Sequence, residues 1–214
     1  MRPFITTLVL TGALFGLSQA AARPQAPRPD GLAPLDASAP VTYFVERGTS
    51  GAAYREGDPE LARWALQAWE RAANGKLRFA QGEEDRAILQ VHWVPAAAGE
   101  YGEMRRTLVN GRPGASVFIR PDTEALGPDI ARAARTDPLM RETIVYLTCV
   151  HEIGHALGLS HTANFADIMY FFGYGGDIPE FFSRYRRQLR VRDDIGHVSG
   201  LSADDVARLR TLYP

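Results

Sequence analysis

Three histidines and one glutamate lie within eleven residues, from His151 to His161, and have the types and spacing of a metal site. His151 and His155 are four residues apart, so on a helix both imidazoles share one face and can bind one Zn²⁺ at about 2.0–2.1 Å each. Glu152 follows the first histidine and is turned away from that face. It stays off the metal but reaches a water beside it, where it can act as a general base.

Gly158 separates this helical pair from the third histidine. Glycine readily adopts the left-handed conformation that ends a helix, so the chain can reverse there and return His161 as a third ligand. Three protein ligands leave a fourth position for water, which is typical of a catalytic rather than a structural zinc site. A short H-E-x-x-H pattern also occurs by chance, but the longer pattern with Gly158 and His161 in register is much more specific.

This pattern resembles that of the metzincin metallopeptidases, and the residues that follow resemble the matrixins among them. Residues 162–170 resemble the run from the third ligand to the Met-turn, with Met169 eight residues after His161. Residues 201–214 resemble the matrixin closing helix. The resemblance is specific in the final third of the chain and collinear from about Pro40. It implies that Met169 forms a hydrophobic floor beneath the zinc.

The resemblance implies an α+β metzincin (zincin) fold. It has a twisted mixed sheet of about five strands, three helices, an active-site helix at the floor of the cleft, and a mostly helical and irregular C-terminal subdomain. β-Branched and aromatic residues predict strands, and 3.6-residue periodicity predicts helices. Strands are expected at residues 41–45, 77–80, 88–94, 107–109 and 115–119, and helices at 58–73 and 136–157 and after 202. Residues 96–102 are expected to form a loop, and Asn110-Gly111 between the last two strands suggests that they form a hairpin-like pair.

The same patterns predict where several individual side chains lie in these helices and strands. Asp58 is expected to cap its helix and Ser202 the last one. Asp204 and Asp205 lie in the first turn of that last helix, either as plain capping residues or, as the resemblance implies, as a brace for the Met-turn or for the mature N-terminus. His92 falls on the less buried face of its strand and is not expected to be a ligand.

The composition is that of one ordinary globular domain. The 214 residues are 45% apolar and 23% charged with a net charge of −1, which gives no reason to expect nucleic-acid binding. Residues 1–22 have the basic start, apolar run and small residues of a signal peptide cleaved after Ala20 or Ala22; an uncleaved anchor is the alternative. Residues 23–39 are expected to form a proline-rich linker or short pro-segment, and residues 40–214 a matrixin-like catalytic domain.

The leader predicts a secreted protein, extracellular or, in a bacterium, periplasmic. No stable membrane insertion is expected after the leader is removed, and we expect a monomer.

The only cysteine, Cys149, is interpreted as a core residue. A pro-segment cysteine, which many matrixins use to block the zinc, is therefore missing. Asp30 or Asp36 is an alternative blocking ligand, and a plain tether is the simpler interpretation.

Metal binding beyond the three histidines is expected to be limited. No histidine lies between Trp93 and His151, so we predict no structural zinc of the kind found in vertebrate-type matrixins. Ca²⁺ at Asp122 or Glu124 stays open. Phe171 stands where astacin-like relatives place a tyrosine ligand, so no such ligand is assigned.

Substrate contacts are predicted from the resemblance. Residues 117–119 match the strand at the upper rim of the matrixin cleft, so Val117 and Phe118 are predicted to bind an added substrate strand, with Tyr170 nearby. An interior strand is the alternative. Residues 171–200 are rich in aromatic residues and arginine, which indicates either a pocket wall favouring bulky apolar side chains with acidic neighbours, or a packed loop with a solvated basic edge.

The sequence thus predicts a secreted zinc endopeptidase acting on proteins or peptides, with His151, His155 and His161 on the metal and Glu152 as general base. Two other interpretations stay open. One is a catalytically silent metzincin module that binds peptides. The other is a zinc hydrolase that acts on a non-peptide amide.

Overall fold

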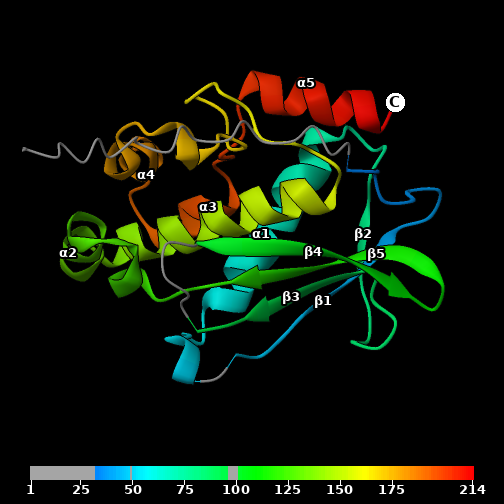
Figure 1. The fold of residues 1–214 in the computed structure, drawn as a ribbon, viewed down its shortest axis with the longest axis horizontal. Helices are drawn as coiled ribbons and strands as arrows, with labels where there is room; N and C mark the ends of the chain where they lie inside the picture. Colours follow the sequence, from blue (N-terminus) through cyan, green and yellow to red (C-terminus); the bar gives the residue numbers. More distant parts are fainter. Residues whose placement is uncertain (1–31, 49, 96–100) are drawn as a thin grey trace, which may run out of the picture.

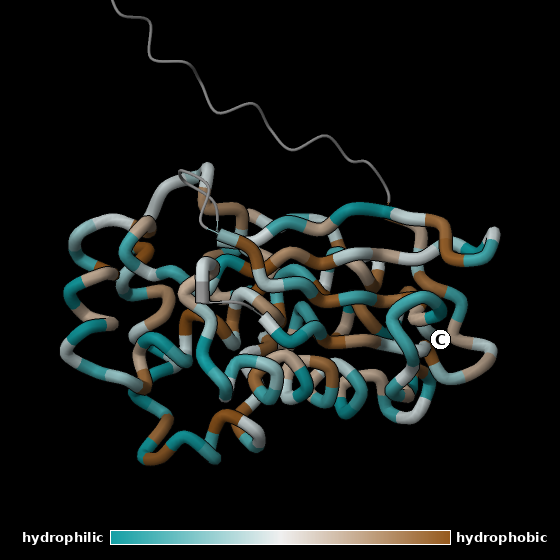
Figure 2. The backbone as a smooth tube through the Cα atoms, turned by 90° about the horizontal axis from the view of Figure 1, so that it is seen from below, coloured by the Kyte–Doolittle hydropathy of each residue, from teal (hydrophilic) through white to brown (hydrophobic). Residues whose placement is uncertain are grey.

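The computed structural model describes residues 32–48, 50–95 and 101–214. The predicted signal peptide at 1–22, the first part of the proline-rich segment and most of the loop predicted at 96–102 lie outside the described residues. Hydrophobic and hydrophilic residues are interspersed along the described chain (Figure 2). No helix in the described ranges is long and apolar enough to cross a membrane.

A five-stranded mixed sheet forms one layer of the fold (Figure 1). Its order is β2-β1-β3-β5-β4, and every neighbouring pair is parallel except β4 with β5. The strands are β1 (Val41–Val45), β2 (Phe79–Gln81), β3 (Leu89–Trp93), β4 (Gly102–Val109) and β5 (Arg112–Ile119). This sheet, with the helices described below, confirms the predicted α+β class and the number of strands.

The predicted β4–β5 hairpin turns at Asn110 and Gly111. Both residues have positive φ, 51° and 77°, as the two central residues of a type I′ turn require. Strand β5 pairs with β3 on one side and β4 on the other, so β4 is the edge strand. The prediction that Val117 and Phe118 lie at the rim is therefore corrected: both are in the interior strand.

Two long helices pack together behind this sheet. Helix α1 (Asp58–Ala72) contacts α3 (Pro138–Ala156), and the Trp69 indole donates to the Val150 carbonyl at 2.9 Å. Figure 1 shows α3 running alongside β4. Three shorter α-helices are α2 (Pro128–Thr136), α4 (Ile178–Arg186) and α5 (Ala203–Leu212). The described residues thus contain two helices, α2 and α4, beyond the three that were predicted.

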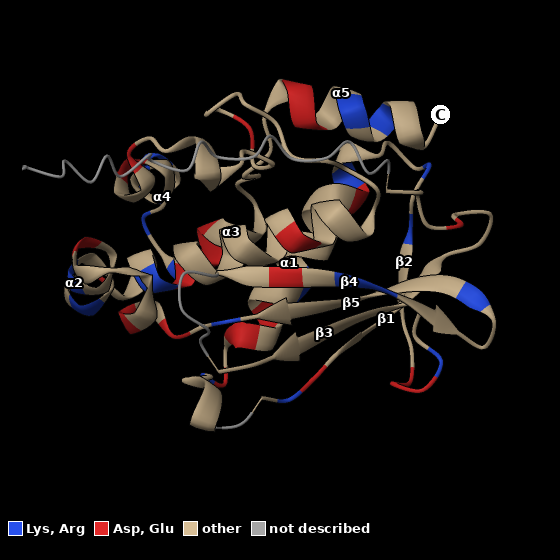
Figure 3. Ribbon diagram, viewed as in Figure 1, with Lys and Arg blue, Asp and Glu red and all other residues tan. Residues whose placement is uncertain are grey.

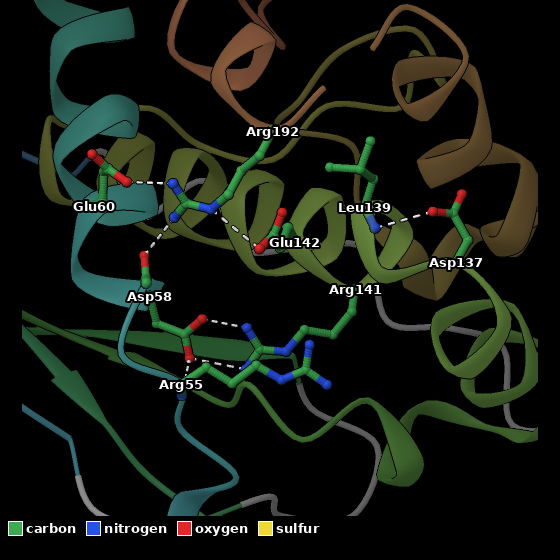
Figure 4. Close-up of polar contacts among 9 residues, drawn as sticks. Arg55, Asp58, Glu60, Asp137, Leu139, Arg141, Glu142 and Arg192 are labelled. Carbon is green, nitrogen blue, oxygen red and sulfur yellow. Dashed lines mark hydrogen bonds and ion pairs between the residues drawn. The ribbon is translucent and has the colours of Figure 1, made fainter. Parts of the chain in front are cut away.

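A buried ion pair joins the beginnings of α1 and α3 (Figure 4). Asp58 accepts two hydrogen bonds from Arg141, one of them at 2.9 Å, and both side chains are at most 3% exposed. Asp58 is the first helical residue and not the expected N-cap, because its carboxylate is committed to Arg141 and the Arg55 amide. Arg192, from the C-terminal part of the chain, binds both Glu60 of α1 and Glu142 of α3. This arginine therefore links the same two helices a second time.

Residues 32–39 do not behave as the predicted linker. Leu35 is only 3% exposed and belongs to the hydrophobic core. Arg112 on β5 lies 3.3 Å from the Asp36 carboxylate. The packed domain therefore begins upstream of Pro40, and we call residues 32–36 the N-terminal strap.

Candidate metal centre

Helix α3 supplies the first two histidines and the glutamate. Its start is set by Asp137, whose carboxylate accepts from the Leu139 amide at 3.0 Å, and by Pro138 in the first turn. The helix ends at Ala156, and Gly158 follows with φ of +104°. That backbone conformation, predicted from the glycine, turns the chain back so that His161 faces the helix.

The three imidazoles converge on one point. Nε2 of His161 lies 3.2 Å from Nε2 of His151 and 3.1 Å from Nε2 of His155. A tetrahedral Zn²⁺ about 2.05 Å from each nitrogen separates its ligand atoms by about 3.3 Å. These are the only three His, Cys, Asp or Glu side chains of the described residues that form such a group. The donor set therefore fits zinc.

Backbone carbonyls orient two of these rings. Nδ1 of His151 donates to the Ile168 carbonyl at 2.7 Å, and Nδ1 of His155 donates to the Leu159 carbonyl at 2.8 Å. A carbonyl only accepts, so the proton stays on Nδ1 and the Nε2 lone pair faces the centre. Such bonds are the usual second layer of a metal site.

Burial also keeps the imidazoles neutral. It lowers the pKa of His151 well below its ordinary value, lowers that of His155, and lowers the pKa of His161 to about 4. Neighbouring histidines add to the effect for His151 and His161. Neutral imidazole is the form that binds a metal, so the site is set for metal at neutral pH.

Glu152 lies beside this centre and under the start of the edge strand. Its side chain is buried and lines the same cleft as the three histidines. A Cβ added at Gly102 would lie 2.6 Å from Glu152 Cγ and 3.0 Å from its Oε1. The absence of a side chain at Gly102 thus allows β4 to lie directly on the carboxylate.

Met169 forms a buried surface beneath α3. It is fully buried, and a Cβ added at Gly154 would lie 2.5 Å from its sulfur and 3.0 Å from the Trp69 ring. The turn that contains Met169 is held by Asp205, whose carboxylate accepts from the Ile168 amide at 2.8 Å and from the Ser202 amide at 2.9 Å. Asp205 therefore both caps α5 and braces the Met-turn, combining the two interpretations. Figure 3 shows the acidic start of α5.

A cleft of about 460 Å³ contains the metal centre. Its lining includes the three histidines and Glu152, and the beginning of β4 forms one rim. Four further lining residues, Tyr101, Phe172, Phe181 and Phe182, contact one another, and we call them the aromatic end of the cleft. Phe171 also lines the cleft but packs against the His161 ring, with ring centroids 4.9 Å apart.

The aromatic end is a packed cluster that joins Tyr101, directly before β4, to residues of the segment after the Met-turn. Tyr101 contacts Phe172 and Phe182 with ring centroids 5.3 and 5.6 Å apart. Burial raises the pKa of Tyr101 to about 12, so its hydroxyl stays neutral. The predicted aromatic wall is present, whereas no arginine lines the cleft within the described residues.

Four of the five arginines of this segment bind other groups of the protein instead. Arg184 donates to the backbone carbonyls of residues 165 and 166, and Arg186 binds Asp137. Arg187 binds Glu180, and Arg192 binds the two glutamates of α1 and α3. The predicted preference for acidic substrate neighbours thus has no support from these residues.

Other predicted residues divide between the site and the rest of the fold. Tyr170 lines the cleft, but its hydroxyl donates to the Gly175 carbonyl at 3.1 Å. Phe118 stacks on His92 on the outer face of the sheet, away from the metal. Asp36 binds Arg112 and is not part of the metal group, while Asp30 lies outside the described residues. Cys149 is buried in the core, as predicted.

Sequence reasoning missed the rim residues 101–104. The available signal was charge: β4 contains Glu103, Arg105 and Arg106, as protective edge strands often do, whereas residues 115–119 of β5 are mostly apolar. That contrast would have placed β4 outside β5.

Comparison with a family profile agrees with this geometry. The sequence profile of the family described as Matrixin matches residues 37–178, which is most of the chain and includes the metal centre and the Met-turn. No curated protein matches. Among solved structures, the crystal structure of myroilysin matches with 19% identity over 82% of this chain and 83% of that chain, at a TM-score of 0.36. At that level of likeness nothing about this chain's chemistry is drawn from myroilysin.

The fold and the three-histidine centre define a metzincin-type zinc metallopeptidase. From the profile match the chain belongs to the matrixin family.

Proposed function

We propose that this matrixin is an endopeptidase in which Zn²⁺ is held by His151, His155 and His161 and Glu152 is the general base. The convergence of three Nε2 atoms 3.1–3.2 Å apart next to a buried glutamate carries this proposal. When bound, Zn²⁺ lowers the pKa of a coordinated water to about 7 and polarises a carbonyl group as a Lewis acid.

The chain's own groups move the proton. Glu152 accepts a proton from the attacking water, which adds to the carbonyl carbon of the scissile peptide bond. Glu152 then returns this proton to the leaving amine, so that one water is consumed and a carboxylic acid and an amine are formed.

Strand β4 is proposed to seat the substrate in place of the predicted β5. Within the described sheet, β4 pairs only with β5, so its outer backbone groups are available to an extended peptide. The first residues of β4 line the cleft, and the aromatic end of the cleft lies next to them. A substrate strand on β4 would place a bulky apolar side chain in that end.

A peptide-library digest with and without a chelator tests substrate class and metal dependence together. We expect cleavage that stops with the chelator, returns with zinc and selects Phe, Leu or Met on one side of the scissile bond. Replacing Phe181 with Ala, which enlarges the aromatic end, should shift that selection. Cleavage that ignores the chelator would contradict the proposal.

Glu152→Gln tests the general base. The amide keeps the shape but cannot take a proton, so we expect retained zinc and a loss of cleavage of about 10²–10⁴-fold. The same assay separates the proposal from a silent peptide-binding module, in which wild type and variant would both bind peptides and cleave none. It also tests for a hydrolase of non-peptide amides, which would leave the peptide library intact.

Export is proposed from the composition of residues 1–22, whose basic start and apolar run fit a signal peptide. Expression with this leader in a secreting host should release a chain shortened by 20 or 22 residues if cleavage follows Ala20 or Ala22. Retention of the full-length chain in the membrane would instead indicate an uncleaved anchor.

A further inference from the structure

Four parts of the chain meet at the turn between the second and third histidines. The turn consists of residues 156–160, and it joins the end of α3 to His161. The carbonyl groups at a helix end have no partner within the helix and need one elsewhere. Here the partners come from β4, from the last residues of the chain and, through both, from the N-terminal strap.

Arg106 on β4 binds the helix end directly. Its guanidinium donates to the Ala156 carbonyl at 3.0 Å and to the His155 carbonyl at 3.3 Å. The same group donates to the Ala33 carbonyl of the N-terminal strap at 2.6 Å. A cation at a helix C-terminus is also favoured by the helix dipole. Arg106 thus links the edge strand to the strap and to the backbone of His155, one of the proposed zinc ligands.

Tyr213 makes the second connection. Its hydroxyl donates to the Leu157 carbonyl at 3.0 Å and accepts from the Leu35 amide at 3.1 Å. Tyr213 is 5% exposed and Leu35 is 3% exposed, so both hydrogen bonds are shielded from water. Removing the hydroxyl would leave a buried amide and a buried carbonyl without this partner.

The strap also lies against Gly158 itself. A Cβ added at Gly158 would lie 2.9 Å from the Leu32 carbonyl oxygen and 3.2 Å from the Pro34 backbone. The turn is therefore covered from outside by residues that the sequence suggested were a tether. The strap, Arg106 and Tyr213 thus all contact this turn or the helix end next to it.

We infer that Arg106, Tyr213 and the N-terminal strap are positioning residues for the metal centre. They hold the turn that fixes His155 relative to His161, and a chain that lacks the strap binds zinc more weakly. The inference rests on the proposed zinc site and goes beyond it, because none of these residues touches the metal. It also predicts that a mature chain must begin upstream of Leu32 to reach full zinc affinity.

Zinc affinity measured by competition with a chromogenic chelator is the test. The proteins are the chain from residue 23, the chain from residue 40, and the Tyr213→Phe and Arg106→Gln variants of the longer chain. We expect the zinc Kd to rise about tenfold in Tyr213→Phe and in the shorter chain, as for other outer-layer partners of metal ligands. The rise should be smaller in Arg106→Gln, because the side chain of Arg106 is partly exposed and water can replace some of its hydrogen bonds.

Two control variants separate positioning from general stability. Tyr185→Phe removes a hydroxyl of another buried tyrosine that donates to the Val198 carbonyl at 2.7 Å. Arg210→Gln removes an arginine that donates to the Ala72 carbonyl at the end of α1. Tyr185→Phe should lower the urea midpoint of the metal-free protein about as much as Tyr213→Phe does, and Arg210→Gln about as much as Arg106→Gln. Both control variants should leave the zinc Kd unchanged.

The outcomes are distinguishable. If the wild-type chain binds no zinc, the proposed function fails. If it binds zinc and the Tyr213, Arg106 and strap variants bind equally well, the zinc site stands and the positioning inference is overturned. If Tyr213→Phe does not fold, the zinc Kd of Arg106→Gln is used in its place, because Arg106 lies on the partly exposed surface of β4. A Kd equal to that of the wild type would then overturn the positioning inference.

Discussion

Replacing Gly102 with alanine is expected to disable catalysis while sparing the fold and the metal. The new Cβ would lie 2.6 Å from Glu152 Cγ, 2.9 Å from Thr148 Cγ2 and 3.0 Å from Glu152 Oε1. Carbon atoms in contact prefer about 3.5–4.0 Å, so the glutamate side chain must move by about 1 Å. A side chain can make that shift by rotation, so the loss of stability should be small.

The functional cost follows from that displacement. A misplacement of about 1 Å in a reacting group can reduce the rate about 10²-fold. We therefore expect kcat to fall about 100-fold in Gly102→Ala. The zinc Kd should stay at the wild-type value, because the three histidines are not displaced.

The assay is steady-state cleavage of a peptide selected from the library, together with zinc titration and urea unfolding of each protein. Gly82→Ala is the matched control, since its Cβ would meet only the Thr42 side chain at 3.3 Å, beyond β2 and away from the cleft. Wild-type kcat in Gly102→Ala would refute the claim that β4 lies on the general base. A loss of zinc binding would show that the substitution acts on the metal centre instead.

Two further predictions concern stability. Gly154→Ala should lower the free energy of unfolding by about 1–3 kcal/mol in urea melts, despite the better helix propensity of alanine, because its Cβ would overlap the buried Met169 sulfur; an unchanged midpoint would contradict the packing described. The metal-free protein should lose stability as the pH falls below about 6.5, where an unfolded chain protonates its histidines while burial keeps the folded pKa of His161 at about 4. His161→Gln should flatten this dependence, and equal slopes in both proteins would exclude the histidine as its source.

Local patterns predicted the parts of the site that lie close together in the sequence. The helix that carries His151 and His155, the turn at Gly158 and the I′ turn at Gly111 each depend on residues within a few positions of one another. The backbone geometry of those few residues is enough to set each of these three features. The same holds for the cap of α5 by Ser202, which the structure confirms at 3.0 Å from the Asp205 amide.

The features that could not be predicted depend on distant contacts. A hairpin pattern does not state which strand faces the rest of the sheet, so the rim was assigned to Val117 and Phe118 in β5 instead of to β4. The ion pair between Asp58 and Arg141 joins two residues that are far apart in the chain. The strap looked like part of a linker because it belongs to the proline-rich segment 23–39 and contains a single buried residue, Leu35, which forms no periodic pattern.

The central claim is that one zinc ion is held by three histidines beside a glutamate that moves the proton. Metal analysis of the purified chain by inductively coupled plasma mass spectrometry, with cleavage assayed on the same samples, tests it most directly. The account predicts one zinc per chain in the wild type and in Glu152→Gln, cleavage in the wild type alone, and neither zinc nor cleavage in His155→Ala. A zinc-free wild-type protein that still cleaves its peptide, or a His155→Ala variant that keeps both, would contradict it.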